Sequence, residues 1–207
     1  MSILWTGVVM LARVGVWCGG AMLFAAAAIV TAEVLLRKGL GALVGTGFVF
    51  SGSDEISSFL FAVGTSWSLA HVLVTRGHVR IDALYTFFSP RTRVLLDLFA
   101  LLVLGIFAAA LLERAWDAAS TSYMEEIRTN SPQRLLLAWA QIPWFGGIAL
   151  FFLALVLAFL RSAAAFLRGD YAAAAAIAGA ASQDEEIESE LEGLGIQREE
   201  AGSGDRR

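Results

Sequence analysis

The sequence predicts an all-α integral membrane protein with four transmembrane helices, a short interfacial helix and a disordered acidic C-terminal tail. Of the 207 residues, 57% are hydrophobic and 16% are charged, whereas a soluble domain is nearer 45 to 50% and about 25%. Three long runs carry no charge and a fourth carries a single one. The charged residues gather between these runs and in the tail.

The spans follow from the length that a helix needs to cross a bilayer. About 20 mostly apolar residues suffice, since each adds ~1.5 Å to a hydrocarbon thickness of ~30 Å. Three segments contain no charged residue: 14–32, 56–75 and 135–160. A fourth, 94–112, contains one charged residue, Asp97, near one end. We expect the Asp97 carboxylate to reach the headgroups. The helices are expected at about residues 14–36, 55–75, 94–113 and 139–161.

The first span also admits interpretation as a cleaved secretory signal, because Arg13 precedes it and small residues follow at Ala25 to Ala28. The apolar run continues through Ile29 and Val30, which makes it too long for the hydrophobic region of a signal. We therefore expect a retained membrane anchor.

Glycine and proline mark the connections. The segment Gly39 to Ser53 is uncharged, but its 15 residues include five glycines and are too few to span, so it is expected to be a loop. Gly77 is expected to be the left-handed residue that ends the second span, and Pro143 to lie in the first turn of the fourth. The alanine-rich segment Tyr171 to Ala181 predicts a short helix.

The chain divides into a four-helix transmembrane domain at 1–169 and an alanine-rich helix with an acidic tail at 170–207. The last 25 residues hold nine acidic residues against three arginines, so the acidic character of the protein belongs to the tail. The body shows no basic stripe, and no nucleic-acid partner is expected. Seven arginines on the side of the termini, against five basic residues on the other, favour cytoplasmic termini.

Little catalytic chemistry is available. One cysteine, Cys18, and two histidines, His71 and His78, leave few metal ligands, so no cofactor or metal is expected and the chain is not expected to be an enzyme. Ser66 and Ser68 share a span with His71, but no nucleophile turn accompanies them. The charges collect at the ends of the spans, which argues against a solute path within this chain.

Small residues predict close helix packing at two places. Gly15 and Gly19 form a Gly-x-x-x-Gly pair in the first span, and Gly64 with Ser68 repeats that spacing in the second. The contacts could form within the bundle or with a partner.

Polar groups at the ends of the spans predict docking or structural roles. Glu33 and Arg37 are four residues apart, in the acid-first order that favours a helical pair. Asp54 and Glu55 suit the start of the second span. The sequence from His78 to Asp82 alternates polar and apolar residues, as in an interfacial docking strip.

These polar segments resemble the small membrane (Q-type) subunit of tripartite ATP-independent periplasmic (TRAP) transporters. The similarity covers about Val30 to Leu160 and is most specific in the acidic start of the second span and in Arg-Gly-His-Val-Arg-Ile-Asp at 76–82. Ser131 and Ile142-Pro143 with Gly146 continue it. The family's polar positions correspond to the following residues, which we interpret as structural or docking residues: Arg37, Glu55, His78, Arg80, Asp82 and Pro143.

The resemblance implies a small permease subunit in the bacterial inner membrane, without catalytic activity of its own. Its partners would be a large membrane subunit, a periplasmic solute-binding protein that acts through the complex, and membrane lipid. Uptake of an organic acid would be driven by an ion gradient, as in a symporter. The alternatives are a stand-alone four-span membrane scaffold, whose tail recruits a partner, and a small membrane redox or hydrolytic enzyme.

Overall fold

The computed structural model describes residues 2–40, 52–77 and 88–179, and these residues form helices. The elements are α1 (Ser2–Leu35) with a following π-helical turn η1 (Leu36–Leu40), α3 (Ser53–Val74), α4 (Pro90–Met124), α5 (Ala138–Leu167) and α6 (Tyr171–Ala178). Four of the helices are long and apolar enough to cross a membrane. The predicted all-α membrane fold with four transmembrane helices is therefore confirmed. The predicted tail lies outside the described residues.

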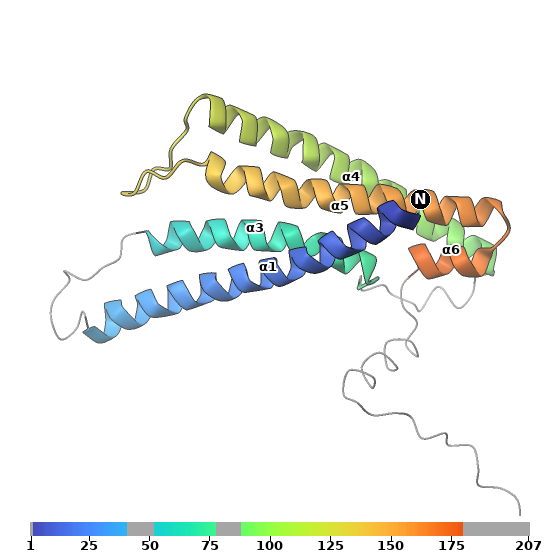
Figure 1. Ribbon diagram of the computed structural model, residues 1–207, viewed down its shortest axis with the longest axis horizontal. Coiled ribbons are helices and arrows are strands. Elements are labelled where there is room, and N and C mark those ends of the chain that lie inside the picture. The colour runs from blue at the N-terminus through green and yellow to red at the C-terminus, as the bar shows by residue number, and fades with distance from the viewer. Residues whose placement is uncertain (1, 41–51, 78–87, 180–207) are drawn as a thin grey trace, which may run out of the picture.

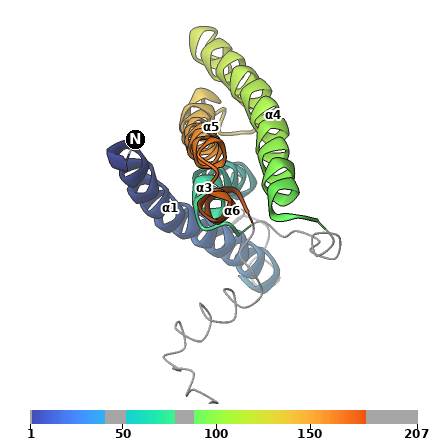
Figure 2. The ribbon, with the colours of Figure 1, turned by 90° about the vertical axis from the view of Figure 1, so that its right-hand side faces the viewer.

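The four long helices lie side by side in a row, in the order α1, α3, α5, α4 (Figure 1). Seen from one end, α3 and α5 occupy the middle, with α1 and α4 on either side (Figure 2). The buried core consists of small and branched apolar residues on the facing sides of these helices, among them Ala12, Ala70, Ala108 and Leu155. Because the two outer helices have a neighbour mainly on one side, most of their surface faces outward.

The helices extend beyond the expected spans. α1 has 34 residues and α4 has 35, although the uncharged or nearly uncharged runs within them contain 19 each. Charged residues such as Arg13 and Arg114 are exposed and do not end their helices. Hydropathy marks the segment that crosses hydrocarbon, whereas a helix continues into water wherever its backbone bonds are maintained.

Two helix features differ from the expectation. The left-handed residue at the end of α3 is Arg76, with φ 57°. Gly77 follows it and donates its N–H to the Val72 carbonyl (2.9 Å). In this Schellman-type cap Arg76 is therefore the C′ residue and Gly77 is the C″ residue. Pro143 lies inside α5 rather than in its first turn, because the helix already begins at Ala138.

α6 folds back against the ends of α4 and α5 (Figure 1). The Asp170 side chain accepts a hydrogen bond from the Ala173 N–H (3.0 Å) and caps α6. The buried Ser162 hydroxyl donates to the Ala174 carbonyl (3.1 Å). Asp97 is 2% exposed and lies beside Gly179, at the end of α6. The expectation that its carboxylate reaches the headgroups is therefore wrong, because α6 covers it.

Candidate functional site

Polar side chains gather at the end of the row where α1 finishes, α3 begins and the α4–α5 hairpin (residues 125–137) turns. This polar end, at the left of Figure 1, contains two of the predicted docking residues, Arg37 and Glu55. The others on the His78–Asp82 strip, namely His78, Arg80 and Asp82, lie outside the described residues.

Glu33 ties α1 to α3. Its side chain is buried, forms an ion pair with Arg37 one turn later, and accepts a hydrogen bond from the Ser53 hydroxyl at the start of α3. A buried carboxylate needs such partners, because its desolvation is costly. The sequence identifies the Glu33–Arg37 pair by its spacing. It does not reveal Ser53, which lies across the glycine-rich segment.

Glu55 ties α3 to the α4–α5 hairpin. One carboxylate oxygen accepts a hydrogen bond from the Ser131 hydroxyl. The other, Oε1, is buried and has no hydrogen-bond partner among the described residues. Gly52, just before α3, packs against the side chain of Gln133 from the same hairpin. The hairpin is therefore docked on the start of α3, at a carboxylate of which one buried oxygen has no hydrogen bond among the described residues.

The hairpin itself is ordered by backbone bonds. The Thr129 N–H donates to the Leu135 carbonyl (2.9 Å) and the Leu137 N–H to the Ile127 carbonyl (3.0 Å). An isolated β-bridge pairs Arg128 with Leu136 between them. These bonds order the hairpin internally, and the Ser131–Glu55 contact joins it to α3.

The predicted small-residue pairs lie at one seam, the line along which α1 packs against α3. Gly15 contacts the backbone of Trp67, and Gly19 faces Gly64 on α3. A Cβ added at Gly64 would lie 2.8 Å from the Gly19 carbonyl oxygen, and one added at Gly19 would lie 2.6 Å from the Ser68 hydroxyl oxygen. These residues therefore pack α1 against α3 within the bundle. The Ser68 hydroxyl bonds to the Gly64 carbonyl of its own helix (2.9 Å).

The seam between α3 and α5 was not predicted. A Cβ added at Gly147 would lie 2.7 Å from the backbone carbonyl carbon of Ser66. Near it, the Trp67 indole N–H donates to the carbonyl of Pro143 (2.9 Å). Pro143 thus accepts a hydrogen bond that ties α5 to α3. Its signal in the sequence was a pair of glycines three and four residues after the proline, at Gly146 and Gly147, since glycine permits close helix approach.

The serine and threonine hydroxyls in the second half of α3 bond to backbone carbonyls of the same helix. The Ser66 hydroxyl bonds to the Val63 carbonyl (2.8 Å), and the Thr75 hydroxyl bonds to the His71 carbonyl (2.9 Å). Within the described ranges, no group of three metal-ligating side chains comes together. These hydroxyl groups thus bond to the backbone of their own helix.

Comparison with known protein families identifies the family of this chain. The model of the tripartite ATP-independent periplasmic transporters, DctQ component, matches residues 6–165. The chain belongs to this family. The DctQ component is the small membrane subunit of a TRAP transporter, and it functions in a complex with a large membrane component and a binding-protein component.

The family match begins well before the residues that carry the sequence resemblance and includes α1 from its second turn onward. It takes in the Gly15–Gly19 seam and both sides of the polar end. α6 lies beyond the matched residues. Comparisons with curated proteins and with solved structures returned no match.

Proposed function

We propose that this DctQ component is a scaffold for the large membrane subunit of a TRAP transporter in the bacterial inner membrane. In this role it supports uptake of an organic acid that a periplasmic binding protein delivers and an ion gradient drives. Both termini lie in the cytoplasm, so the polar end faces the periplasm. The large subunit supplies the ion and solute sites.

The observation that carries this proposal is the open row of helices. An 18-residue membrane window is only 17% buried in α1 and 22% buried in α4. Large apolar side chains such as Trp17 and Phe24 on α1, and Phe99 and Phe107 on α4, are mostly exposed. Exposed apolar faces such as these suit contact with lipid and with a second membrane protein. A single row of helices also does not enclose a path for a solute.

A groove between α1 and α3 offers one contact for that subunit. It has a volume of about 730 Å³ and is lined by small and apolar residues of both helices, including Ala26, Ala27, Val30 and Phe61. Small side chains allow a neighbouring backbone to approach closely. A transmembrane helix of the large subunit fits this chemistry.

Reconstitution tests the function directly. We expect the full-length chain to co-purify with the large subunit, and vesicles that hold both subunits, the binding protein and an ion gradient to accumulate an organic acid. Vesicles that hold only this chain should accumulate none. Accumulation by this chain alone, or uptake by the large subunit and binding protein without it, would contradict the scaffold role.

Glu55 is proposed to hold the large subunit as well as the hairpin, together with Arg37 and the His78–Asp82 strip. Replacing Glu55 by Ala removes the Ser131 contact and the buried oxygen, so we expect recovery of the complex to fall about tenfold, the effect of ~1.4 kcal/mol. The measurement is the yield of large subunit captured with the tagged chain.

Asp54→Ala is the matched control, because Asp54 is the exposed neighbour of Glu55 in the first turn of α3. Truncation after Gly169 is the second control. Recovery with the Glu55 variant equal to that of either control would show that this carboxylate has no part in assembly.

A further inference from the structure

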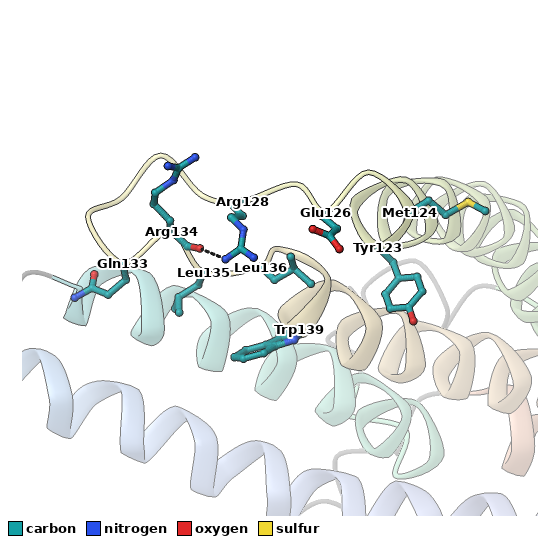
Figure 3. Close-up of a pocket in the computed structure, with 9 residues that line it drawn as sticks. All are labelled: Tyr123, Met124, Glu126, Arg128, Gln133, Arg134, Leu135, Leu136 and Trp139. Atoms are coloured by element: carbon teal, nitrogen blue, oxygen red, sulfur yellow. Dashed lines mark hydrogen bonds between the residues drawn. The ribbon is translucent and has the colours of Figure 1, made fainter.

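A groove at the α4–α5 hairpin, within the polar end but not formed by Glu33 or Glu55, combines charged and amphipathic residues. It has a volume of about 520 Å³ and lies between the end of α4, the hairpin and the first turn of α5. Figure 3 shows Glu126, Arg128 and Leu136 projecting to one side of the hairpin, above Trp139, while the Arg134 guanidinium points away. One cation and one anion therefore share the groove.

The Arg128 side chain is oriented by a backbone carbonyl rather than by a carboxylate. One of its guanidinium N–H groups donates to the Arg134 carbonyl (3.2 Å). Within the described residues, neither Arg128 nor Glu126 forms an ion pair. A guanidinium oriented by a backbone carbonyl retains its other N–H groups for a phosphate, which accepts several charge-assisted hydrogen bonds.

Glu126 occupies a position that normally belongs to glycine. It has φ 50° and follows the end of α4, where the Ile127 N–H closes the helix on the Ser122 carbonyl (3.1 Å). A side chain in this left-handed conformation costs energy relative to glycine. The Glu126 carboxylate, two residues from Arg128 in sequence, is therefore present at a cost to the fold, and strained positions of this kind cluster at ligand sites.

The remaining lining matches the region between lipid headgroups and acyl chains. Trp139 and Tyr123 are 71% and 64% exposed, and Met124 is 82% exposed. Tryptophan and tyrosine prefer this depth, where the ring meets hydrocarbon and the polar atom meets water. Trp139 lies three residues before Ile142, an exposed apolar residue at the start of the lipid-facing part of α5.

From these features we propose that the hairpin groove binds the headgroup of a zwitterionic phospholipid, phosphatidylethanolamine. Arg128 binds the phosphate, Glu126 accepts hydrogen bonds from the primary ammonium, and the indole of Trp139 faces that cation. Met124 and Leu136 contact the beginning of the acyl chains. Phosphatidylglycerol provides the phosphate without the ammonium, and phosphatidylcholine provides a cation without N–H donors.

Native mass spectrometry of the full-length chain released from nanodiscs tests the site. With equal amounts of palmitoyl-oleoyl phosphatidylethanolamine and phosphatidylglycerol, we expect the ethanolamine adduct to predominate about tenfold. Arg128→Gln should reduce both adducts. Glu126→Gly should abolish the preference and keep the fold, because glycine suits the backbone there.

The matched controls are Glu125→Gln, next to the groove in sequence but not lining it, and Arg114→Gln, an exposed arginine on α4. Both should leave the adducts unchanged, and phosphatidylcholine should bind more weakly than phosphatidylethanolamine. Equal adducts of the two main lipids on the wild-type chain, or an unchanged preference in Glu126→Gly, would overturn the proposal. Loss of the adduct when the large subunit binds would instead assign the groove to a protein contact and overturn it too.

Discussion

Replacing Gly19 by Leu is expected to separate α1 from α3 and to lower the free energy of unfolding by about 3 kcal/mol. The Cβ of any larger residue at this position would meet the backbone carbonyl of Gly64 and would lie 2.6 Å from the Ser68 hydroxyl oxygen. A backbone carbonyl within a helix cannot move aside as a flexible side chain can. The whole of α1 must therefore shift outward, which removes its packing against α3 along the seam.

The measurement is unfolding by sodium dodecyl sulfate in mixed micelles, followed by circular dichroism and tryptophan fluorescence. Gly20→Leu is the control, because Gly20 is exposed and a Cβ there meets nothing within 4 Å. We expect this variant to be unchanged or to gain up to ~1 kcal/mol from helix propensity. Equal stability of the Gly19 and Gly20 variants would show that the close approach of α1 and α3 does not stabilise the fold.

Gly147→Ala is expected to destabilise the second seam by about 2 kcal/mol. Alanine is normally the better helix former, so the sign of this effect is diagnostic. The added Cβ would overlap the Ser66 hydroxyl and lie 2.7 Å from the carbonyl carbon of the same residue. α5 would have to withdraw from α3 and weaken the hydrogen bond from Trp67 to the Pro143 carbonyl.

The same unfolding assay measures this effect, and Gly146→Ala provides its control. A Cβ at Gly146 would make ordinary contact with the Trp67 ring, at 3.7 Å, so we expect a gain of up to ~1 kcal/mol. If both alanine variants gain stability, α3 and α5 are not as closely packed as this structure has them.

The sequence was most informative where one residue type decides the structure locally. Three uncharged runs and a fourth with a single charge identified the four crossings, and the Gly15–Gly19 and Gly64–Ser68 spacings marked residues that pack α1 against α3. The spacing did not say whether the partner of a small-residue pair lies in the same chain. That depends on which helix faces which, and it is decided by packing between distant segments.

Contacts between distant residues account for the rest. Ser53 and Ser131 bind Glu33 and Glu55 from other parts of the chain, and no local pattern connects them. Asp97 was predicted to reach the headgroups because it lies near the end of an apolar run, but α6 folds over it. Helix ends were also poorly predicted, since a helix that leaves the hydrocarbon has no reason to stop at its first charge.

Close contacts join neighbouring helices across the row: Gly19 with Gly64, Ser66 with Gly147, and Phe145 with Trp116. Gly19 lies five residues after Val14, where the uncharged run of α1 begins, whereas Trp116 lies four residues after Leu112, where the apolar run of α4 ends. α1 and α4 have 34 and 35 residues, so at a rise of ~1.5 Å per residue each is about 50 Å long, well beyond a hydrocarbon layer of ~30 Å. Both outer helices therefore have more length than one perpendicular crossing needs, and tilting or projection past the headgroups must take up the remaining turns.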